Sequence, residues 1–257
     1  MQRAAQLFRG MMLNSKADAV RGLVRSRRKR ALVPAPRAVA SADTVFVRVV
    51  EAIQAHRLAP GMRLVEEQLG KYFGVSRTIV RHGIAKLAQA GLVDMLPNRG
   101  ATIATPDARR TREVFDARRL IESDLVARVA CRADSDTVAV LRKHLQAEDE
   151  ARTRGDSDLL VRLTGEFHLI LARAAGNRVL AQTLEQIEAI TCLAILAHGR
   201  PDDKACPPDE HSAIVDAIEA GNAKLAVTLM RHHLDHVVAG LDLGPEPSTN
   251  AKERKIR

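Results

Sequence analysis

Three histidines in the C-terminal half of the chain stand where their imidazole rings could meet. His168 follows Thr164 by one helical turn on an apolar stripe, and His233 lies on a similar stripe. His211 opens a further helical stretch. Neutral imidazole is a common ligand for zinc, nickel and similar divalent ions. The pattern is therefore compatible with a metal site, although a single inward histidine is more often a hydrogen-bonded core residue.

A second group of residues suited to recognition lies nearer the N-terminus. Arg77, Thr78 and Arg81 fall in the first turns of a predicted helix, away from its buried stripe, and Ser76 stands at the N-cap position. That end of a recognition helix meets base edges and phosphates in the major groove of DNA. Arg99 lies in a Pro-Asn-Arg-Gly turn, from which it could reach a minor groove or a phosphate. These placements predict DNA binding.

Three helices and a β-hairpin must position these arginines, which is the arrangement of a winged helix-turn-helix over residues 41–107. The first helix begins near Thr44 and is ended by Ala59-Pro60-Gly61, and Arg63-Leu64 leads into a short helix over 66–73. A third helix, capped by Ser76, stops at Gly91. Strands over 92–96 and 101–105 then form the hairpin, or wing.

The histidines are predicted to lie in an all-helical domain over residues 108–241, because no strand pattern returns after Pro106. Ser135 is the expected N-cap of the second helix. Six helices joined by short turns favour an antiparallel bundle, so the fold class is mainly α. They are expected over 109–133, 135–154, 156–175, 178–198, 209–220 and 222–240.

The net charge of +9 belongs to one segment. Residues 1–40 contain ten Lys or Arg and one acid, Asp18, so the rest of the chain sums to zero. Three interpretations of residues 1–40 remain open: a disordered basic arm, a targeting peptide, or translated sequence upstream of the true start. Residues 242–257 are expected to be a disordered tail.

Composition excludes several other classes. Aromatic residues make up 2% of the chain, which argues against a stacking platform for single-stranded nucleic acid. Cys131, Cys192 and Cys206 form no CxxC pair, which fits a reducing cytoplasm rather than a disulfide framework. No run of about 20 apolar residues is present, so a membrane partner is not expected and the predicted location is cytoplasmic.

The N-terminal motifs resemble a known family. The segments Pro60-Gly61-Met62-Arg63-Leu64, Phe73-Gly74-Val75-Ser76-Arg77-Thr78 and Pro97-Asn98-Arg99-Gly100-Ala101 look like the DNA-binding domain of GntR-family regulators. The resemblance implies that Arg63, Arg77, Arg81 and the Arg99-Gly100 wing tip contact operator DNA. His82 and Gly83 depart from the family's usual Glu and Ala, and a glycine inside a helix costs about 1 kcal/mol of helix stability.

The C-terminal motifs resemble the FCD domain of the FadR-like GntR subfamily. They include the segment from Glu113 to Glu122, Glu166-Phe167-His168, His211-Ser212-Ala213-Ile214 and Arg231-His232-His233-Leu234. The resemblance implies a divalent metal, zinc or nickel, held by one Asp and three His in a cavity that also binds a small organic acid.

Carried onto this chain, the ligands are His168, His211 and His233, while Thr164 stands where the Asp is expected. A neutral threonine removes a charge that would offset the cation. Arg118 is a candidate for fixing an effector carboxylate, or equally for a salt bridge to a neighbouring acid. The predicted effector site therefore comprises Arg118, Thr164 and the three histidines.

These features together predict a homodimeric transcriptional regulator that binds a palindromic operator and is a repressor released by a small carboxylate effector. One alternative is a metal-dependent enzyme that uses the three-histidine site. Against it, the sequence identifies no Glu or Asp as a general base beside those histidines. A winged helix that serves only protein contacts is disfavoured by Arg77, Arg81 and Arg99.

Overall fold

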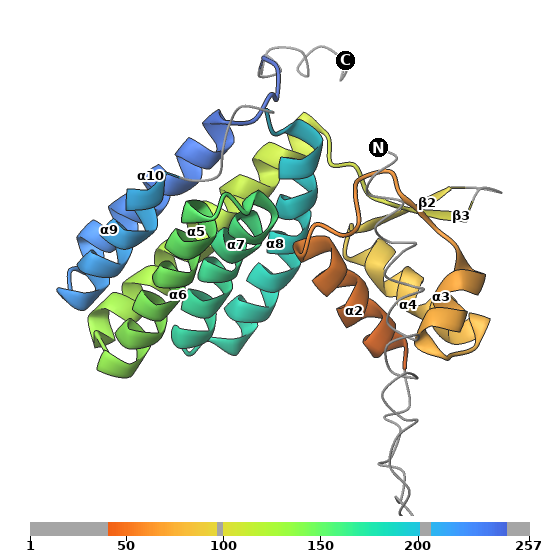
Figure 1. Ribbon diagram of the computed structural model, residues 1–257, viewed down its shortest axis with the longest axis horizontal. Coiled ribbons are helices and arrows are strands. Elements are labelled where there is room, and N and C mark those ends of the chain that lie inside the picture. Colours follow the sequence, from red (N-terminus) through yellow and green to blue (C-terminus); the bar gives the residue numbers. More distant parts are fainter. Residues whose placement is uncertain (1–40, 97–99, 201–206, 246–257) are drawn as a thin grey trace, which may run out of the picture.

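A computed structural model describes residues 41–96, 100–200 and 207–245, and it contains a small mixed unit beside a larger helical one (Figure 1). The predictions for residues 1–40, Arg99 and Cys206 lie outside the described residues. The predicted tail is described as far as residue 245, and its first residues are held in place. Asp242 donates its backbone N–H to the carbonyl of His198, and Arg112 donates to the carbonyls of Leu243 and Gly244.

The smaller unit is a winged helix-turn-helix. Its helices are α2 (Ala42–Gln54), α3 (Glu66–Phe73) and α4 (Arg77–Gln89), and its strands are β1 (Arg63–Leu64), β2 (Val93–Leu96) and β3 (Gly100–Ile103). The antiparallel sheet has the order β1-β3-β2. Two details differ from expectation. The first helix ends at Gln54, six residues before Pro60, because His56 takes a left-handed conformation with φ 54°. Arg63 and Leu64 form a third strand rather than a helix lead-in.

Gly83 has a packing role in this unit. It lies on the buried face of α4, where a Cβ atom would stand 2.6 Å from Cγ1 and 2.7 Å from Cβ of Val45 on α2. Such distances are too short for carbon atoms, so only glycine lets the two helices approach this closely. The helix stability that a mid-helix glycine costs is thus exchanged for close packing of α4 on α2.

The larger unit is an antiparallel bundle of helices, as expected (Figure 1). Its helices are α5 (Ala108–Arg132), α6 (Ser135–Thr153), α7 (Ser157–Ala174), α8 (Arg178–His198), α9 (Pro208–Glu219) and α10 (Ala223–Ala239). Asp134, not Ser135, caps α6, since its carboxylate accepts from the backbone N–H of Thr137 at 3.0 Å. Aspartate caps as well as serine does, so the sequence offered two adjacent candidates.

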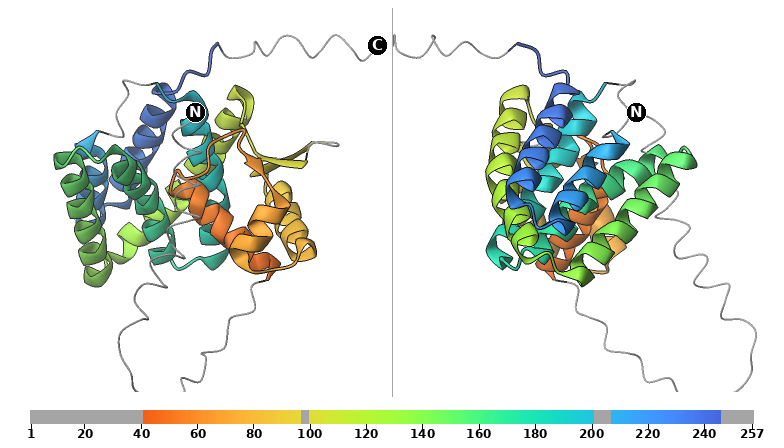
Figure 2. Two further views of the ribbon diagram at one scale, coloured as in Figure 1. Left: turned by 45° about the vertical axis from the view of Figure 1, so that its right-hand side comes forward. Right: turned by 90° about the vertical axis from the view of Figure 1, so that its left-hand side faces the viewer.

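Helix α8 joins the two units. It packs on α5 and α7 in the bundle and also on α2 (Figure 2). The apolar core of the winged helix continues into Val114 of α5 and into Ile190 and Leu193 of α8. By length and composition α8 could cross a membrane, contrary to the expectation that no such segment exists, but half of that window is buried inside the protein. These contacts identify α8 as a core helix.

Candidate DNA-binding surface and histidine centre

The predicted recognition residues lie together at the N-terminal end of α4. Ser76 caps this helix by accepting from the backbone N–H of Ile79 at 3.3 Å. Arg77, Thr78 and Arg81 follow in the first two turns, and all are exposed. This end of α4 therefore offers cationic side chains and free backbone N–H groups to an anionic partner.

Two glutamates on α3 hold these arginines, and sequence reasoning missed them. Both oxygens of Glu66 accept from Nε of Arg81, at 2.9 and 3.0 Å. Glu67 lies 3.6 Å from Nη2 of Arg77. The pairs are exposed, so each is worth little in free energy and a phosphate can displace it. Their position in the first turn of α3, where acidic residues suit the positive end of a helix, was the available signal.

The wing carries the remaining predicted DNA contacts. Arg63 is exposed on β1, opposite Thr102 of β3. Gly100 opens β3 with φ 83°, a conformation that favours glycine. The structure thus places Arg63 and Gly100 in one sheet beside α4. Arg99, which directly precedes Gly100 in the chain, lies outside the described residues.

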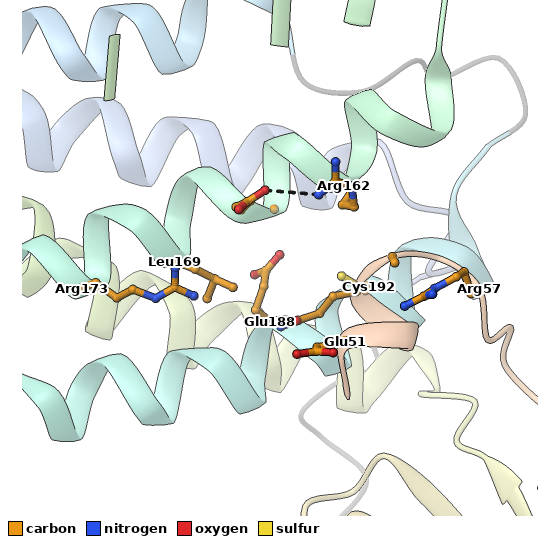
Figure 3. A pocket seen from close by; sticks show the side chains of 11 residues that line it. Glu51, Arg57, Arg162, Leu169, Arg173, Glu188 and Cys192 are labelled. Atoms are coloured by element: carbon orange, nitrogen blue, oxygen red, sulfur yellow. Dashed lines mark ion pairs between the residues drawn. The ribbon is translucent and has the colours of Figure 1, made fainter. Parts of the chain in front are cut away.

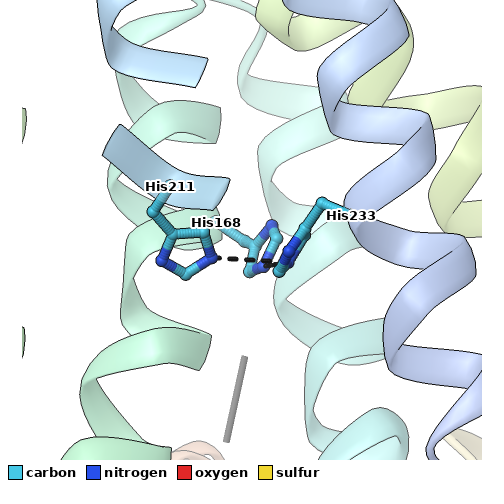
Figure 4. A group of neighbouring side chains, drawn as sticks. All are labelled: His168, His211 and His233. Carbon is cyan, nitrogen blue, oxygen red and sulfur yellow. Dashed lines mark hydrogen bonds between the residues drawn. The ribbon is translucent and has the colours of Figure 1, made fainter. Parts of the chain in front are cut away.

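The three histidines meet inside the bundle (Figure 4). His168 lies on α7, His211 on α9 and His233 on α10, and each side chain is at most 3% exposed. Nε2 of His233 is 3.3 Å from Nε2 of His211 and 3.3 Å from Nε2 of His168. Ligands of a tetrahedral zinc ion, at 2.0–2.1 Å from the metal, lie about 3.3 Å from one another. Two of the three separations therefore match those around a zinc-like ion, and all three donor atoms lie within 4.8 Å of one another.

A glutamate binds the outer nitrogen of each ring. Glu122 on α5 is 2.5 Å from Nδ1 of His168, and Glu148 on α6 is 3.0 Å from Nδ1 of His211. Glu210, directly before His211, is 2.8 Å from Nδ1 of His233. Carboxylates that accept from the second nitrogen of a metal-binding histidine fix its tautomer and orientation.

With their Nδ1 atoms on the glutamates, the three rings point their Nε2 atoms toward one another. Because an ionised carboxylate only accepts, Nδ1 of each ring must donate, and in a neutral imidazole Nε2 is then a bare lone pair. Burial lowers the pKa of His168 to about 3 and that of His233 to about 4, so both rings are neutral at pH 7. The Nε2 lone pairs of His168 and His233 therefore face each other 3.3 Å apart, and they repel unless a cation lies between them. The donor set thus fits a divalent metal.

The glutamates also bear on the missing aspartate. Thr164 is buried, but its hydroxyl donates to the carbonyl of Val161 at 2.9 Å, which makes it part of its own helix. Burial by itself raises the pKa of Glu122, yet Arg118 and His168 outweigh it and hold that pKa at about 2. The pKa values of Glu148 and Glu210 are likewise about 2. The negative charge that an aspartate ligand would supply is therefore present on the three glutamates behind the histidine rings.

Arg118 lies beside this centre and is fully enclosed. Its Nε donates to Glu122 at 2.6 Å, and its Nη1 is 3.1 Å from Glu188 on α8. Its Nη2 is buried and has no hydrogen-bond partner among the described residues. Both roles foreseen for Arg118 are thus compatible with the geometry, because it forms salt bridges and still has one donor group unused.

Three glutamates stand beside the histidines, and sequence reasoning did not identify them. Glu122, Glu148 and Glu210 were invisible as a group because they come from three helices, although their spacing gave a partial signal. Glu122 follows Arg118 by four residues, and Glu210 adjoins His211. All three carboxylates contact the outer nitrogen, Nδ1, of a histidine. Their position is therefore that of groups that orient the rings.

The exposed pair His232 and His236 has a simpler environment. Nδ1 of His236 is 2.7 Å from Glu210, whereas His232 is 3.8 Å from the same carboxylate and largely exposed. Cys192 is buried and Cys131 is exposed, and neither belongs to the histidine centre. These residues add no ligand to that centre.

The fold and these two sites define a class of protein: a winged helix-turn-helix regulator with an all-helical domain that encloses three converging histidines. Comparison with protein families gives the same result. Residues 41–103 match the "Bacterial regulatory proteins, gntR family" model, and residues 113–236 match the "FCD domain" model. The chain belongs to the GntR family of transcriptional regulators, and its FCD domain is consistent with the FadR-like subfamily.

Individual relatives are regulators as well. The chain is 29% identical over 223 residues to the putative L-lactate dehydrogenase operon regulatory protein of Escherichia coli, covering 76% of this chain and 84% of that protein. It is 28% identical over 188 residues to the probable D-xylose utilization operon transcriptional repressor of Paenarthrobacter nicotinovorans, covering 72% and 82%. These relatives favour a regulator over the enzyme alternative.

Solved structures share the architecture. A putative GntR transcriptional regulator from Rhodococcus sp. RHA1 superposes with a TM-score of 0.66 at 25% identity, covering 77% of this chain and 95% of that one. E. coli McbR/YncC superposes with a TM-score of 0.69 at 18% identity, with the same coverage, and supports the fold alone. The predicted fold class, a winged helix-turn-helix followed by a helical bundle, is confirmed.

Proposed function

We propose that this regulator binds a palindromic operator as a cytoplasmic homodimer and that a small carboxylate effector releases it. Ser76, Arg77, Thr78 and Arg81 on α4 enter the major groove, while Arg63 and the Arg99-Gly100 wing tip contact the neighbouring backbone or minor groove. The exposure of these arginines and their weak, displaceable ion pairs support this assignment. Two heads related by a twofold axis require half-sites about one helical turn apart or a multiple of it.

We further propose that His168, His211 and His233 hold a divalent zinc or nickel ion. The observation that carries this proposal is the convergence of three Nε2 atoms whose rings are fixed by carboxylates at Nδ1. When bound, the metal supplies a Lewis-acid centre with open positions for an oxygen ligand. Three histidine ligands and no carboxylate ligand leave the cation uncompensated in its own shell, which favours an anionic effector.

The effector site lies around that centre in this proposal. The unused Nη2 of Arg118 supplies a charge-assisted donor for a carboxylate. Thr164, one turn before His168, stands where an aspartate is expected. Because threonine is neutral, the positive charge of the cation stays available to the anionic effector. Binding there acts on DNA affinity by favouring the arrangement of heads that does not fit the operator.

The decisive experiment is metal analysis of tag-free protein, comparing wild type with His211→Ala. We expect about one zinc or nickel ion per wild-type chain and none in the variant. His232→Ala, which changes an exposed histidine on α10, is the matched control and should retain the metal. Absence of metal from wild type, also after incubation with zinc or nickel, contradicts the metal proposal but leaves DNA binding untouched.

DNA binding is tested separately with an operator selected from a randomised DNA pool. Wild-type protein should enrich a palindrome and bind it as two chains. Enrichment of no sequence, or binding as one chain to an asymmetric site, contradicts the proposed operator mode.

A further inference from the structure

A pocket that none of the three histidines lines lies between the two units (Figure 3). It has a volume of about 310 Å³. One wall comes from the end of α2 and the segment after it, and the other from α7 and α8. Residues that bear on its chemistry are Ala55, Arg57, Arg162, Gly165, Leu169 and Glu188. Because it lies where the DNA-binding unit meets the bundle, its occupancy would bear on how the two are held.

Glu188 is the buried polar group of this pocket. Its side chain is 4% exposed, and its buried Oε2 accepts no hydrogen bond from any described residue. Nη1 of Arg118 is close enough for an ion pair but is not aligned for a hydrogen bond. A Cβ at Gly165 would stand 2.9 Å from Oε1, so glycine at this position leaves room for the carboxylate. A buried carboxylate without hydrogen bonds is costly unless a partner satisfies it.

Counting buried charges indicates which partner is missing. Arg118 is one cation between two carboxylates, Glu122 and Glu188. Glu122 is also satisfied by His168, whereas Glu188 has Arg118 as its only recorded partner in the described part of the chain. The group is therefore one positive charge short, and burial raises the pKa of Glu188 to about 7. A ligand that brings a cationic donor would complete it.

Arginines also line this pocket, Arg57 and Arg162 on one side of Glu188 and Arg173 on the other (Figure 3), together with the acids Glu51 and Glu166. Arg57 forms no ion pair within the described residues, and the pair between Arg162 and Glu166 is loose, at 3.5 Å. A guanidinium group binds carboxylates through two parallel hydrogen bonds. Leu169 and Ala55 provide an apolar surface in the same pocket. The pocket thus combines an anionic point, an apolar wall and a cationic rim.

We propose that this pocket is a second ligand site that binds an α-amino acid, with the ammonium group on Glu188 and the carboxylate on Arg57. Glu188 belongs to the bundle and Arg57 follows α2, so the bound ligand bridges the two units. It would stiffen their contact and shift the population of head positions. The site requires no metal and none of the three histidines lines it, while Arg118 contacts both Glu188 and Glu122.

The test measures melting temperature of the full-length protein, after chelation of metals, with each of the twenty amino acids at 10 mM. We expect at least one to raise the melting temperature by about 5 °C at a hundredfold excess over its Kd. For that amino acid, the 2-hydroxy acid with the same side chain lacks the ammonium group and should bind at least tenfold more weakly.

Variants connect the effect to the pocket. Glu188→Gln keeps the shape but removes the charge, and Arg57→Met removes the rim guanidinium from an exposed position that cannot affect folding of the core. Both should lower affinity at least tenfold, while Arg178→Met, an exposed control on α8 that does not line the pocket, should not. His211→Ala should retain the shift, which separates this site from the proposed metal and effector site.

Three results would overturn the proposal. They are no shift with any of the twenty amino acids, equal affinity for the hydroxy acid, or a shift that survives both Glu188→Gln and Arg57→Met. If Glu188→Gln failed to fold, Arg57→Met and the hydroxy-acid comparison would still decide between the outcomes. In each of these cases water alone would satisfy Glu188.

Discussion

The winged helix and the histidine centre both depend on charged side chains, but they hold them in opposite ways. Arg77 and Arg81 are exposed and pair with glutamates of the adjacent helix, in water, where such pairs are weak. The histidines are buried and bind glutamates from α5, α6 and α9, where low dielectric strengthens each contact. The first arrangement leaves its cations available to an incoming phosphate, and the second fixes its donors before a ligand arrives.

The largest expected effect concerns the exposed cations. The double variant Arg77→Ala/Arg81→Ala should weaken operator binding by about 30-fold or more, because each arginine contact contributes about 1–3 kcal/mol. Fluorescence anisotropy over a range of salt concentrations measures this, and the salt dependence should become shallower. Arg128→Ala, on the exposed face of α5, is the control. Unchanged affinity in the double variant would return the winged helix to the protein-contact interpretation.

The second prediction concerns a buried charge, the carboxylate of Glu148, which contacts His211 rather than the proposed metal. Glu148→Gln replaces the acceptor for Nδ1 of His211 with a weaker one, so metal affinity should fall by about 10–100-fold. Glu150→Gln, exposed on the same helix, should have no effect. Competition with a chelator measures both. Equal affinities for the two variants would show that the glutamate shell does not tune the site.

Titration of the buried carboxylate of Glu188 should make the stability of the protein depend on pH. Its folded pKa of about 7 lies above the ordinary value of 4.5, because burial and Glu122 outweigh Arg118. The stabilisation from its proton is therefore complete below pH 4.5 and is lost as pH rises through 7. Relative to Glu188→Gln, wild type should lose about 2–3 kcal/mol of unfolding free energy between pH 5 and pH 8.

Urea unfolding of metal-free protein at the two pH values checks this prediction. The charged and titratable groups that face Glu188 are Arg118, Glu122 and the Cys192 thiol. Glu166→Gln, which removes a more exposed carboxylate of the same pocket, is the control and should leave the pH dependence unchanged. A pH dependence that is the same in wild type and Glu188→Gln would contradict it.

The smallest expected effect tests packing in the winged helix. Gly83→Ala places a methyl group 2.6 Å from Val45, and overpacking costs about 1–3 kcal/mol, against a gain of about 1 kcal/mol in helix propensity. The net loss of stability is about 1 kcal/mol, seen as a lower melting temperature. A higher melting temperature would show that α2 and α4 can separate at no cost.

The local features of the fold were predictable from the sequence. Helix α3 and helix α8 have the predicted bounds, since apolar periodicity and end signals agree there. The cap at Ser76 and the exposed face of α4 followed from residues within one helical turn. Prediction failed where two local signals competed, as at Asp134 and Ser135, or where pairing was long-range, as in β1, whose partner Thr102 is 39 positions away along the chain.

The sequence by itself determined that three histidines face the bundle interior and that arginines gather at one end of a recognition helix, because helical periodicity fixes which face a residue occupies. Only the tertiary structure decided what those side chains meet. Glu122 and His168 are 46 residues apart, and His211 and Glu148 are 63 apart, so no local pattern links them. Packing of α5, α6, α7, α9 and α10 brings them together, and that packing turns three separate imidazoles into one oriented set of donors.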